Sequence, residues 1–254
     1  MLKDENVFEG EKENSFRNWK SYFLDFFMLF LAVSLGFFAD NIRENISENA
    51  KEKEYIISMI EDAELDKINI EQAIVGNTTR ALHLDSVAKI CINYNSSTSS
   101  HADLYRHYMF GLMHPDFISP TDRTMQQLKN AGGMRLIRNK TAADMFVLYN
   151  DKAKKLAGQQ LYYERYQNQS IDFATQLFNF ERYGVDVPPT GLTDFQDLNN
   201  YFGIIDNDKK KLMQFSNIVF VYIGVVKYYT VLLKEMHEEA DKLIQTLKRE
   251  YQLQ

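Results

Sequence analysis

The chain has 254 residues, a formal net charge of −6, and the 45% hydrophobic and 25% charged content of an ordinary folded protein. Only 4 prolines and 11 glycines interrupt it, which favours long helices over many short strands. No basic run is long enough to form a nucleic-acid-binding face, so we expect no nucleic-acid partner. The single cysteine, Cys91, excludes an internal disulfide and is expected to be a small buried side chain.

The first predicted element is an apolar segment near the N-terminus. Residues 26–39 carry no charge, and Asp25 is the one charged residue between Tyr22 and Ala39. Eighteen helical residues extend about 27 Å, close to the ~30 Å hydrocarbon core of a bilayer. The segment therefore predicts a membrane anchor. The apolar side chains expected to contact lipid are Phe26, Phe27, Leu29, Phe30, Leu31, Val33, Leu35, Phe37 and Phe38.

Two alternatives to a membrane anchor remain open. A cleaved signal peptide fits less well, because the first twenty residues are mixed in charge and no A-x-A-type cleavage site follows the apolar run. A buried core helix of a soluble protein would have to be apolar on every face, and residues 26–38 nearly are. Arg17 and Lys20 before the segment weigh slightly toward a cytoplasmic N-terminus.

The helix is predicted to continue past the polar residues that begin at Asp40, because no glycine or proline follows before Gly76. Its continuation carries an apolar stripe with helical spacing. The stripe consists of Ile56, Met59, Ile60, Ala63, Ile70 and Ile74. Glu64 and Lys67 are spaced to pair along its surface. Gly76 and Asn77 favour a helix end.

The rest of the chain is predicted to form further helices. The longer ones are Thr79–Tyr94, Ala102–Met113, Thr141–Tyr183 and Lys209–Tyr251. A shorter helix is expected to start with Ser119 as N-cap and Pro120 at its first position, and to end at Gly132 or Gly133. Composition predicts loops at 95–100 and 183–193, and Thr193 with Gln196 is spaced as a capping box.

Residues 217–233 of the last helix are long and apolar enough to raise the question of a second membrane span. Lys227 would then lie deep in the membrane, at a cost of a few kcal/mol. The apolar stripe also continues past this segment to Leu247. We interpret it as the most buried helix of a bundle, and the second span stays open as an alternative.

One motif resembles a family of small, uncharacterised single-pass inner-membrane proteins, found mainly in Bacteroidota. In that family a T-x-x-x-L-K-x-x-G-x-x-x-L-I-x-N pattern follows a single N-terminal span. Here the pattern is carried by Thr124, Leu128, Lys129, Gly132, Leu136, Ile137 and Asn139. Residues 36–66 are similar to the family's junction between span and helix. The resemblance implies a cytoplasmic N-terminus with the bulk outside the inner membrane, and it implies no activity.

The motif also has a direct physical interpretation. Leu128 would pack inward, Gly132 or Gly133 would end a helix, and Asn139 would cap the next one. A second, functional interpretation is a cationic rim for an anionic ligand or partner, formed by Arg123, Arg135 and Arg138. His114 and Asp116, which lie nearby in the sequence, complete this candidate binding site.

No sequence signature of catalysis or metal binding is present. There is no phosphate-binding glycine loop, no nucleophile elbow and no zinc motif. His101, His107 and His114 cluster in the sequence, but their spacing is too wide for joint chelation without a further ligand. We therefore expect no cofactor and no enzymatic activity. An enzyme whose active site is assembled from distant residues remains the alternative.

These observations predict an all-α protein with one transmembrane helix that continues into an extracytoplasmic bundle of long helices. The expected division is a cytoplasmic tail at 1–20, the span at 21–39 and the bundle at 40–254. The expected function is a membrane-anchored binding, interaction or sensor module, or a subunit of a membrane complex. Its partners would be the lipid bilayer and another protein or a second copy, bound through the long helices.

Overall fold

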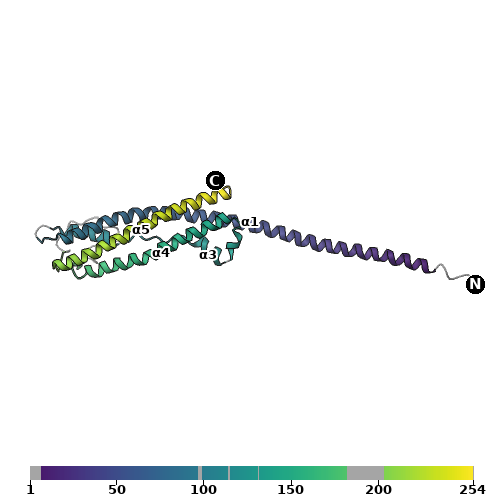
Figure 1. Ribbon diagram of the computed structural model, residues 1–254, viewed down its shortest axis with the longest axis horizontal. Helices are drawn as coiled ribbons and strands as arrows, with labels where there is room; N and C mark the ends of the chain where they lie inside the picture. The colour runs from purple at the N-terminus through teal and green to yellow at the C-terminus, as the bar shows by residue number, and fades with distance from the viewer. Residues whose placement is uncertain (1–6, 97–98, 114, 131, 182–202, 254) are drawn as a thin grey trace, which may run out of the picture. The chain divides into compact units, whose positions relative to one another are not determined.

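The computed structural model describes residues 7–96, 99–113, 115–130, 132–181 and 203–253, with side chains from Trp19 onward (Figure 1). Its helices are α1 (Val7–Ile92), α2 (His101–Tyr108), α3 (Arg123–Asn130), α4 (Lys140–Ala174) and α5 (Lys209–Glu250). A π-helical turn, η1 (Met109–Met113), follows α2, and a 3-10 turn, η2 (Gly133–Leu136), follows α3. The described residues contain no β-strand, only one isolated bridge between Phe178 and Ile204. The predicted all-α fold class is confirmed.

The chain divides into two compact units, Met1–Glu54 and Tyr55–Gln254. In the first unit, the described residues are helical throughout. The most apolar eighteen-residue window of this helix has no residue buried, and Phe37 is 73% exposed. The helix is therefore long and apolar enough to cross a membrane.

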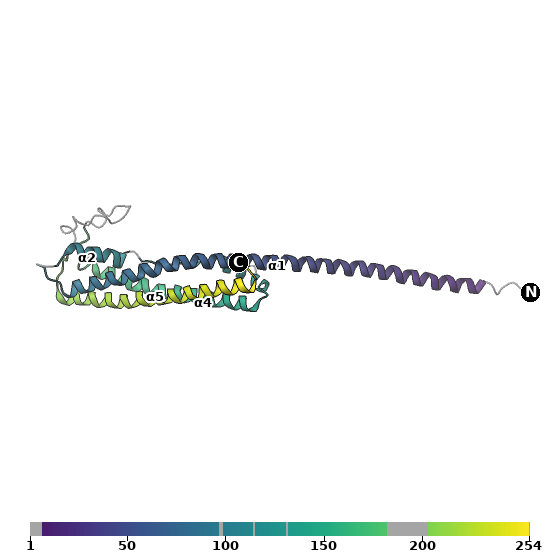
Figure 2. The same cartoon turned by 90° about the horizontal axis from the view of Figure 1, so that it is seen from above.

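The second unit is a helical bundle built from the later part of α1 together with α4 and α5, which lie side by side (Figures 1 and 2). α4 and α5 run antiparallel. At one end Asn139 donates a hydrogen bond to Glu250 at 3.0 Å, and at the other the ring of Phe173 stacks on Phe215. The predicted stripe on α1 faces the core: Ile56, Ala63 and Ile70 are fully buried.

Tyr163 of α4 lies at the centre of the core. Its ring meets those of Phe117, Tyr222 and Tyr229 edge-on, with centroid separations of 4.7, 5.3 and 5.4 Å. Such edge-to-face pairs contribute beyond their buried area, by about 0.5–1.5 kcal/mol each. α5 buries one face of its length in this core, and 44% of its most apolar window is buried. That agrees with a bundle helix, although α5 also has the length and composition of a span.

The predicted helix end at Gly76 and Asn77 is wrong, because α1 continues to Ile92 and includes the segment predicted as a separate helix. Gly76 is needed there for close approach, since a Cβ at that position would collide with the side chain of Asp116. The predicted pairing of Glu64 with Lys67 is not found either. Lys67 pairs with Asp241, and Lys248 approaches Glu64 at 3.3 Å, so both side chains reach α5.

Other predicted boundaries agree in part. α5 begins at the predicted residue, Gly132 adopts the left-handed conformation at φ 62°, and Asn139 caps α4 by accepting from the amide of Ala142. α3 begins three residues later than predicted. α4 ends at Ala174 instead of Tyr183, and beyond this end the Leu177 carbonyl accepts a hydrogen bond from the amide of Ile205. The predicted loop 183–193 and the capping box after it lie outside the described residues.

Candidate functional site

A row of buried polar side chains runs along one face of α1. Asp62, Asp66, Asn77 and Arg80 are each no more than 3% exposed and recur at helical spacing. We call these four residues the polar row. Their partners lie in α4, in η1, at the start of α3, and in residues 115–122, which we call the strap. Buried polar groups cost free energy unless they are hydrogen-bonded, so the row specifies where these segments dock.

Asp62 and Asp66 hold the start of α3. Asp62 accepts hydrogen bonds from the Thr124 amide at 3.2 Å and its hydroxyl at 2.5 Å, and also from Arg123 at 2.8 Å. Asp66 accepts from the amide and the hydroxyl of Thr121, both at 2.8 Å. The Thr124 amide in the first turn of α3 is thus capped by a carboxylate from α1. Thr121 is held by Asp66 before the helix, which explains why α3 does not start at Pro120 as predicted.

Asp66 also accepts a hydrogen bond of 2.5 Å from the hydroxyl of Tyr149 on α4. Burial raises the pKa of Asp66 above its ordinary value, although its hydrogen bonds from Tyr149 and Thr121 act in the opposite direction. Burial, followed by the neighbouring carboxylate of Asp66, raises the pKa of Tyr149 strongly. The tyrosine therefore stays neutral and acts as a donor, not as an acid or base.

Asn77 and Arg80 hold the other end of the strap. Asn77 donates to the Ala73 carbonyl at 2.8 Å and to the Asp116 carbonyl at 2.9 Å, and it accepts from the Tyr163 hydroxyl at 2.8 Å. Arg80 donates to the carboxylate of Asp116 and to the carbonyl of Gly111 in η1, each at 3.1 Å. Asn77 uses both ends of its amide, so its orientation is fixed.

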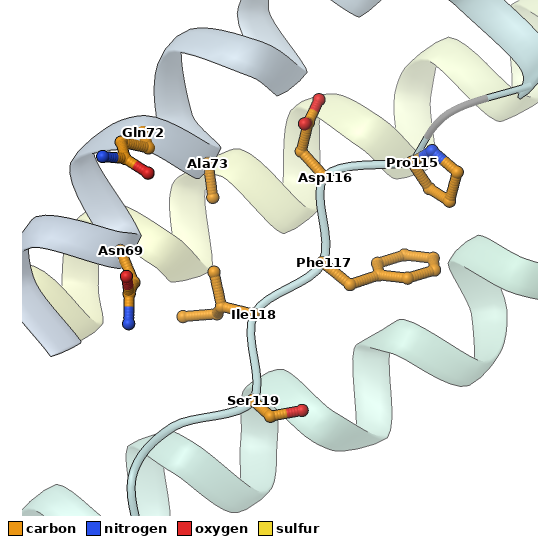
Figure 3. Close-up of a pocket in the computed structure, with 8 residues that line it drawn as sticks. All are labelled: Asn69, Gln72, Ala73, Pro115, Asp116, Phe117, Ile118 and Ser119. Atoms are coloured by element: carbon orange, nitrogen blue, oxygen red, sulfur yellow. The ribbon is translucent and has the colours of Figure 1, made fainter. Parts of the chain in front are cut away.

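A pocket of about 340 Å³ opens where the strap crosses α1 (Figure 3). It is lined by Asn69, Gln72 and Ala73 from α1 and by Pro115, Asp116, Phe117, Ile118 and Ser119 from the strap. In Figure 3, Ile118 points toward α1 and Phe117 points away from it. Ile118 therefore faces the pocket, while the ring of Phe117 packs on Tyr163 in the core. Two amides and a half-exposed carboxylate make the pocket polar, and it suits a small hydrogen-bonding ligand.

Two buried polar atoms beside this region, Nε of Arg80 and the hydroxyl oxygen of Tyr222, make no well-formed hydrogen bond with any residue that the structure describes, although Tyr222 lies close to both Tyr163 and Arg80. Burial, followed by the charge of neighbouring Tyr163, raises the pKa of Tyr222 strongly, while burial raises the pKa of Tyr163 to about 12. Both phenols are neutral at physiological pH. The site can therefore donate hydrogen bonds from neutral phenols and bind a polar group.

The three arginines of the predicted cationic rim are exposed, and the rim stays a prediction. Arg123 is engaged with buried Asp62, while Arg135 in η2 and Arg138 after it are exposed on the surface. Asp116 is an intramolecular partner of Arg80. His114 lies outside the described residues. The sequence offered no sign of Arg80, because an arginine within an otherwise ordinary helical segment resembles a solvated charge.

His101 and His107, which lie close together in the sequence, have separate partners in the structure. His107 meets His83 of α1, with their Nδ1 atoms 2.8 Å apart, while His101 lies beside Tyr94 at 3.2 Å. Burial lowers the pKa of both His83 and His107. Among the described residues, no group of three or more His, Cys, Asp or Glu side chains is arranged to hold a metal ion.

The chain matches no protein-family model, no curated protein and no solved structure. The resemblance to single-pass membrane proteins therefore stays a prediction that rests on the motif alone. Within that motif, Thr124 and Leu128 are fully buried and Asn139 is a helix cap, so at least part of the pattern serves the docking of α3 and the start of α4.

Proposed function

We propose that the protein is a single-pass membrane protein whose N-terminal helix anchors a non-enzymatic helical bundle. The bundle would serve as a binding or interaction module, either as a sensor or as a subunit of a membrane complex. Its N-terminus would lie in the cytoplasm and the bundle on the outer side of the inner membrane.

One observation carries this proposal: no residue in the most apolar window of the N-terminal helix is buried, while the described residues of the bundle form a core of their own. In the described residues of the bundle, side chains such as Phe146, Phe215 and Leu243 have no exposed surface. The residues of the predicted anchor are mostly more than half exposed. Such a large apolar surface is costly in water and favourable in lipid.

The pocket between α1 and the strap supports the binding role. Its amides come from a rigid helix, and its carboxylate is oriented by buried Arg80. Sites that are held by a buried network bind with a smaller loss of conformational entropy than sites on free loops. The mechanism proposed is therefore recognition of a polar ligand or partner segment at the strap.

Two experiments test the proposal. Reporter fusions after residue 60 and at the C-terminus should both report the outer side of the membrane. A cytoplasmic signal from the C-terminal fusion would contradict the outside-bundle topology or require α5 to span the membrane. For the binding role, the full chain extracted in mild detergent should bring down a specific partner, and that partner should be lost when Gln72→Leu and Asn69→Leu remove the pocket amides.

A further inference from the structure

The outward face of α5 carries an apolar stripe that the described residues of the bundle leave partly exposed. Its apolar members are Met213, Phe220, Val221, Tyr228 and Val231, each between 40% and 49% exposed. They recur with Asn217 and Gly224 at steps of three and four residues, so they lie on one side of the helix. From Met213 to Val231 the stripe is about 27 Å long.

Lysines accompany this stripe and acids do not. Between Lys209 and Lys234 the helix contains five lysines and no aspartate or glutamate, although the whole chain carries a net charge of −6. Lys209, Lys210, Lys227 and Lys234 are exposed, and none of them forms an ion pair with a residue that the structure describes. Acids follow the stripe from Glu235 onward; Glu235 is neutralised by two lysines of α4 at 2.9 and 3.3 Å, and Glu238 is exposed.

We propose that this face of α5 docks on the surface of a membrane that contains anionic phospholipids. The reasoning rests on the proposed function, because the anchor would keep the bundle next to a bilayer. Apolar and aromatic side chains flanked by lysines are the composition of helices that lie in the interface plane, with the lysines near the headgroup phosphates. Tyr228 has the amphipathic ring that interfaces favour.

A second copy of the chain is a less suitable occupant. A parallel helix pair through this face would bring the same lysines together, with no acid between Lys209 and Lys234 to neutralise them. In an antiparallel pair, only the acids that follow the stripe would approach the lysines at its start. Gly224 lies in the stripe with open space around it, and it would allow close approach of another helix. We take the membrane as the occupant because every charge between Lys209 and Lys234 is positive, which matches an anionic surface along the whole stripe.

The test uses the full chain in nanodiscs, with a spin label on Tyr228→Cys or, as control, on Leu82→Cys. Leu82 is 66% exposed on α1, and native Cys91 is buried and gives only the background of the unmutated chain. One set of nanodiscs contains phosphatidylcholine alone, and the other contains equimolar phosphatidylglycerol and phosphatidylcholine. The measurement is the accessibility of each label to oxygen relative to a water-soluble nickel complex.

Docking predicts that this ratio rises about twofold or more at position 228 in the anionic nanodiscs and stays unchanged at position 82, because oxygen concentrates among acyl chains. Lys227→Glu with Lys234→Glu should abolish the rise, while Lys129→Glu with Lys140→Glu should leave it intact. An unchanged ratio at 228 in both lipids would overturn the proposal, whatever protein partner the face then has. Failure of the chain to assemble into nanodiscs would instead refute the anchor.

Discussion

The carboxylate of Asp116 occupies the space that a side chain at position 76 would need, so Gly76 and Asp116 are complementary across 40 residues of sequence. The same carboxylate accepts a hydrogen bond of 3.1 Å from Arg80 one helical turn further along α1. Glycine is therefore retained in the middle of a long helix, where it costs about 1 kcal/mol relative to alanine, because it admits the strap to the polar row.

Replacing Gly76 by alanine should destabilise the bundle by about 1–2 kcal/mol, because displacement of Asp116 from Arg80 outweighs the gain in helix propensity. Urea unfolding of the full chain in mild detergent would measure the change in the free energy of unfolding. Gly158→Ala on α4 is the matched control. That glycine is helical with nothing within 4 Å of an added Cβ, so the substitution should stabilise by up to about 1 kcal/mol. Equal effects at both positions would contradict the close approach.

Removing the carboxylate with Asp116→Ala should cost about 1–3 kcal/mol, because buried Arg80 keeps only the carbonyl of Gly111 as partner. This cost in stability is lower than that of breaking a fully buried ion pair, since the side chain of Asp116 is 44% exposed. The double variant with Gly76→Ala should cost less than the sum of the single variants. As a control, Asp103→Ala breaks the exposed pair with Arg106 and should cost less than about 1 kcal/mol.

Replacing Asp66 by alanine and replacing it by asparagine should destabilise the protein to different extents. Asp66→Ala leaves the Tyr149 hydroxyl and the Thr121 amide without an acceptor, at a cost of about 2–4 kcal/mol. Asp66→Asn keeps one acceptor oxygen for Thr121, and its amide can donate to Tyr149, so the loss should stay below about 1 kcal/mol. Comparable losses in both variants would show that the network does not depend on these hydrogen bonds.

Asp66 also predicts a dependence on pH. Its pKa is raised in the folded state, so the folded protein binds this proton more readily than the unfolded chain does. The wild type should therefore gain stability relative to Asp66→Asn as the pH falls through the raised pKa of Asp66 toward its ordinary value of 3.8. Paired urea titrations of the two proteins at several acidic pH values would measure the difference. A gap that narrows on acidification would contradict the prediction.

The pair formed by His83 and His107 predicts that stability falls, and does not rise, as the pH is lowered. Burial lowers the pKa of His83 and His107; Arg80 and Arg106 add to the effect at His83, while Asp103 opposes it at His107. The stability that this pair contributes is complete above the ordinary pKa of 6.5 and is lost as the pH falls through 6.5 toward the lowered values.

Thermal unfolding of the wild type should thus show a falling midpoint between about pH 7.5 and 5.5. His107→Gln should flatten that dependence. Glutamine at position 107 leaves the neighbouring arginines in place and removes both the titrating ring of His107 and its charge beside His83, so the comparison reports on the pair. A midpoint that falls equally in both proteins would assign the pH dependence to other groups.

A charge placed in the proposed anchor should release the protein from the membrane. Leu31→Arg puts a guanidinium near the centre of the span, at a cost of about 2.5–3.5 kcal/mol or more. Alkaline carbonate extraction should then move the variant partly into the soluble fraction. Ile46→Arg is the control, because Ile46 is 65% exposed but lies beyond the predicted span. The control should remain in the membrane pellet.

Long uninterrupted apolar periodicity made parts of the fold predictable. The helix at 209–251 and the stripe from Ile56 to Ile70 can be predicted from the sequence, because a helix with one buried face carries apolar residues at regular helical spacing. The capping role of Asn139 was also visible, since a helix cap is a local feature. In each case the deciding interaction lies within one element or its immediate neighbours.

Features that depend on distant partners were not predictable. Gly76 and Asn77 have the composition of a helix end, and only the approach of Asp116 explains why the helix continues. Ser119 and Pro120 likewise have the composition of a helix start, but Asp66 binds Thr121 and thereby delays the start of α3. For the candidate site, the sequence indicated Asp116 but gave no sign of the polar row that orients it.

The direction of the polar row has a consequence for the synthesis of the chain. Each partner of Asp62, Asp66, Asn77 and Arg80 from another segment is made later, from 31 residues after Arg80 for Gly111 to 86 after Asn77 for Tyr163. When α1 leaves the ribosome, the two carboxylates and the guanidinium have no native partner yet, and the amide of Asn77 has only the Ala73 carbonyl of its own helix. The strap, η1 and α3 supply the partners of Asp62 and Arg80, and α4 then supplies the hydroxyls of Tyr149 and Tyr163. Nascent chains that stop before Tyr163 should consequently stay open to proteases and chaperones.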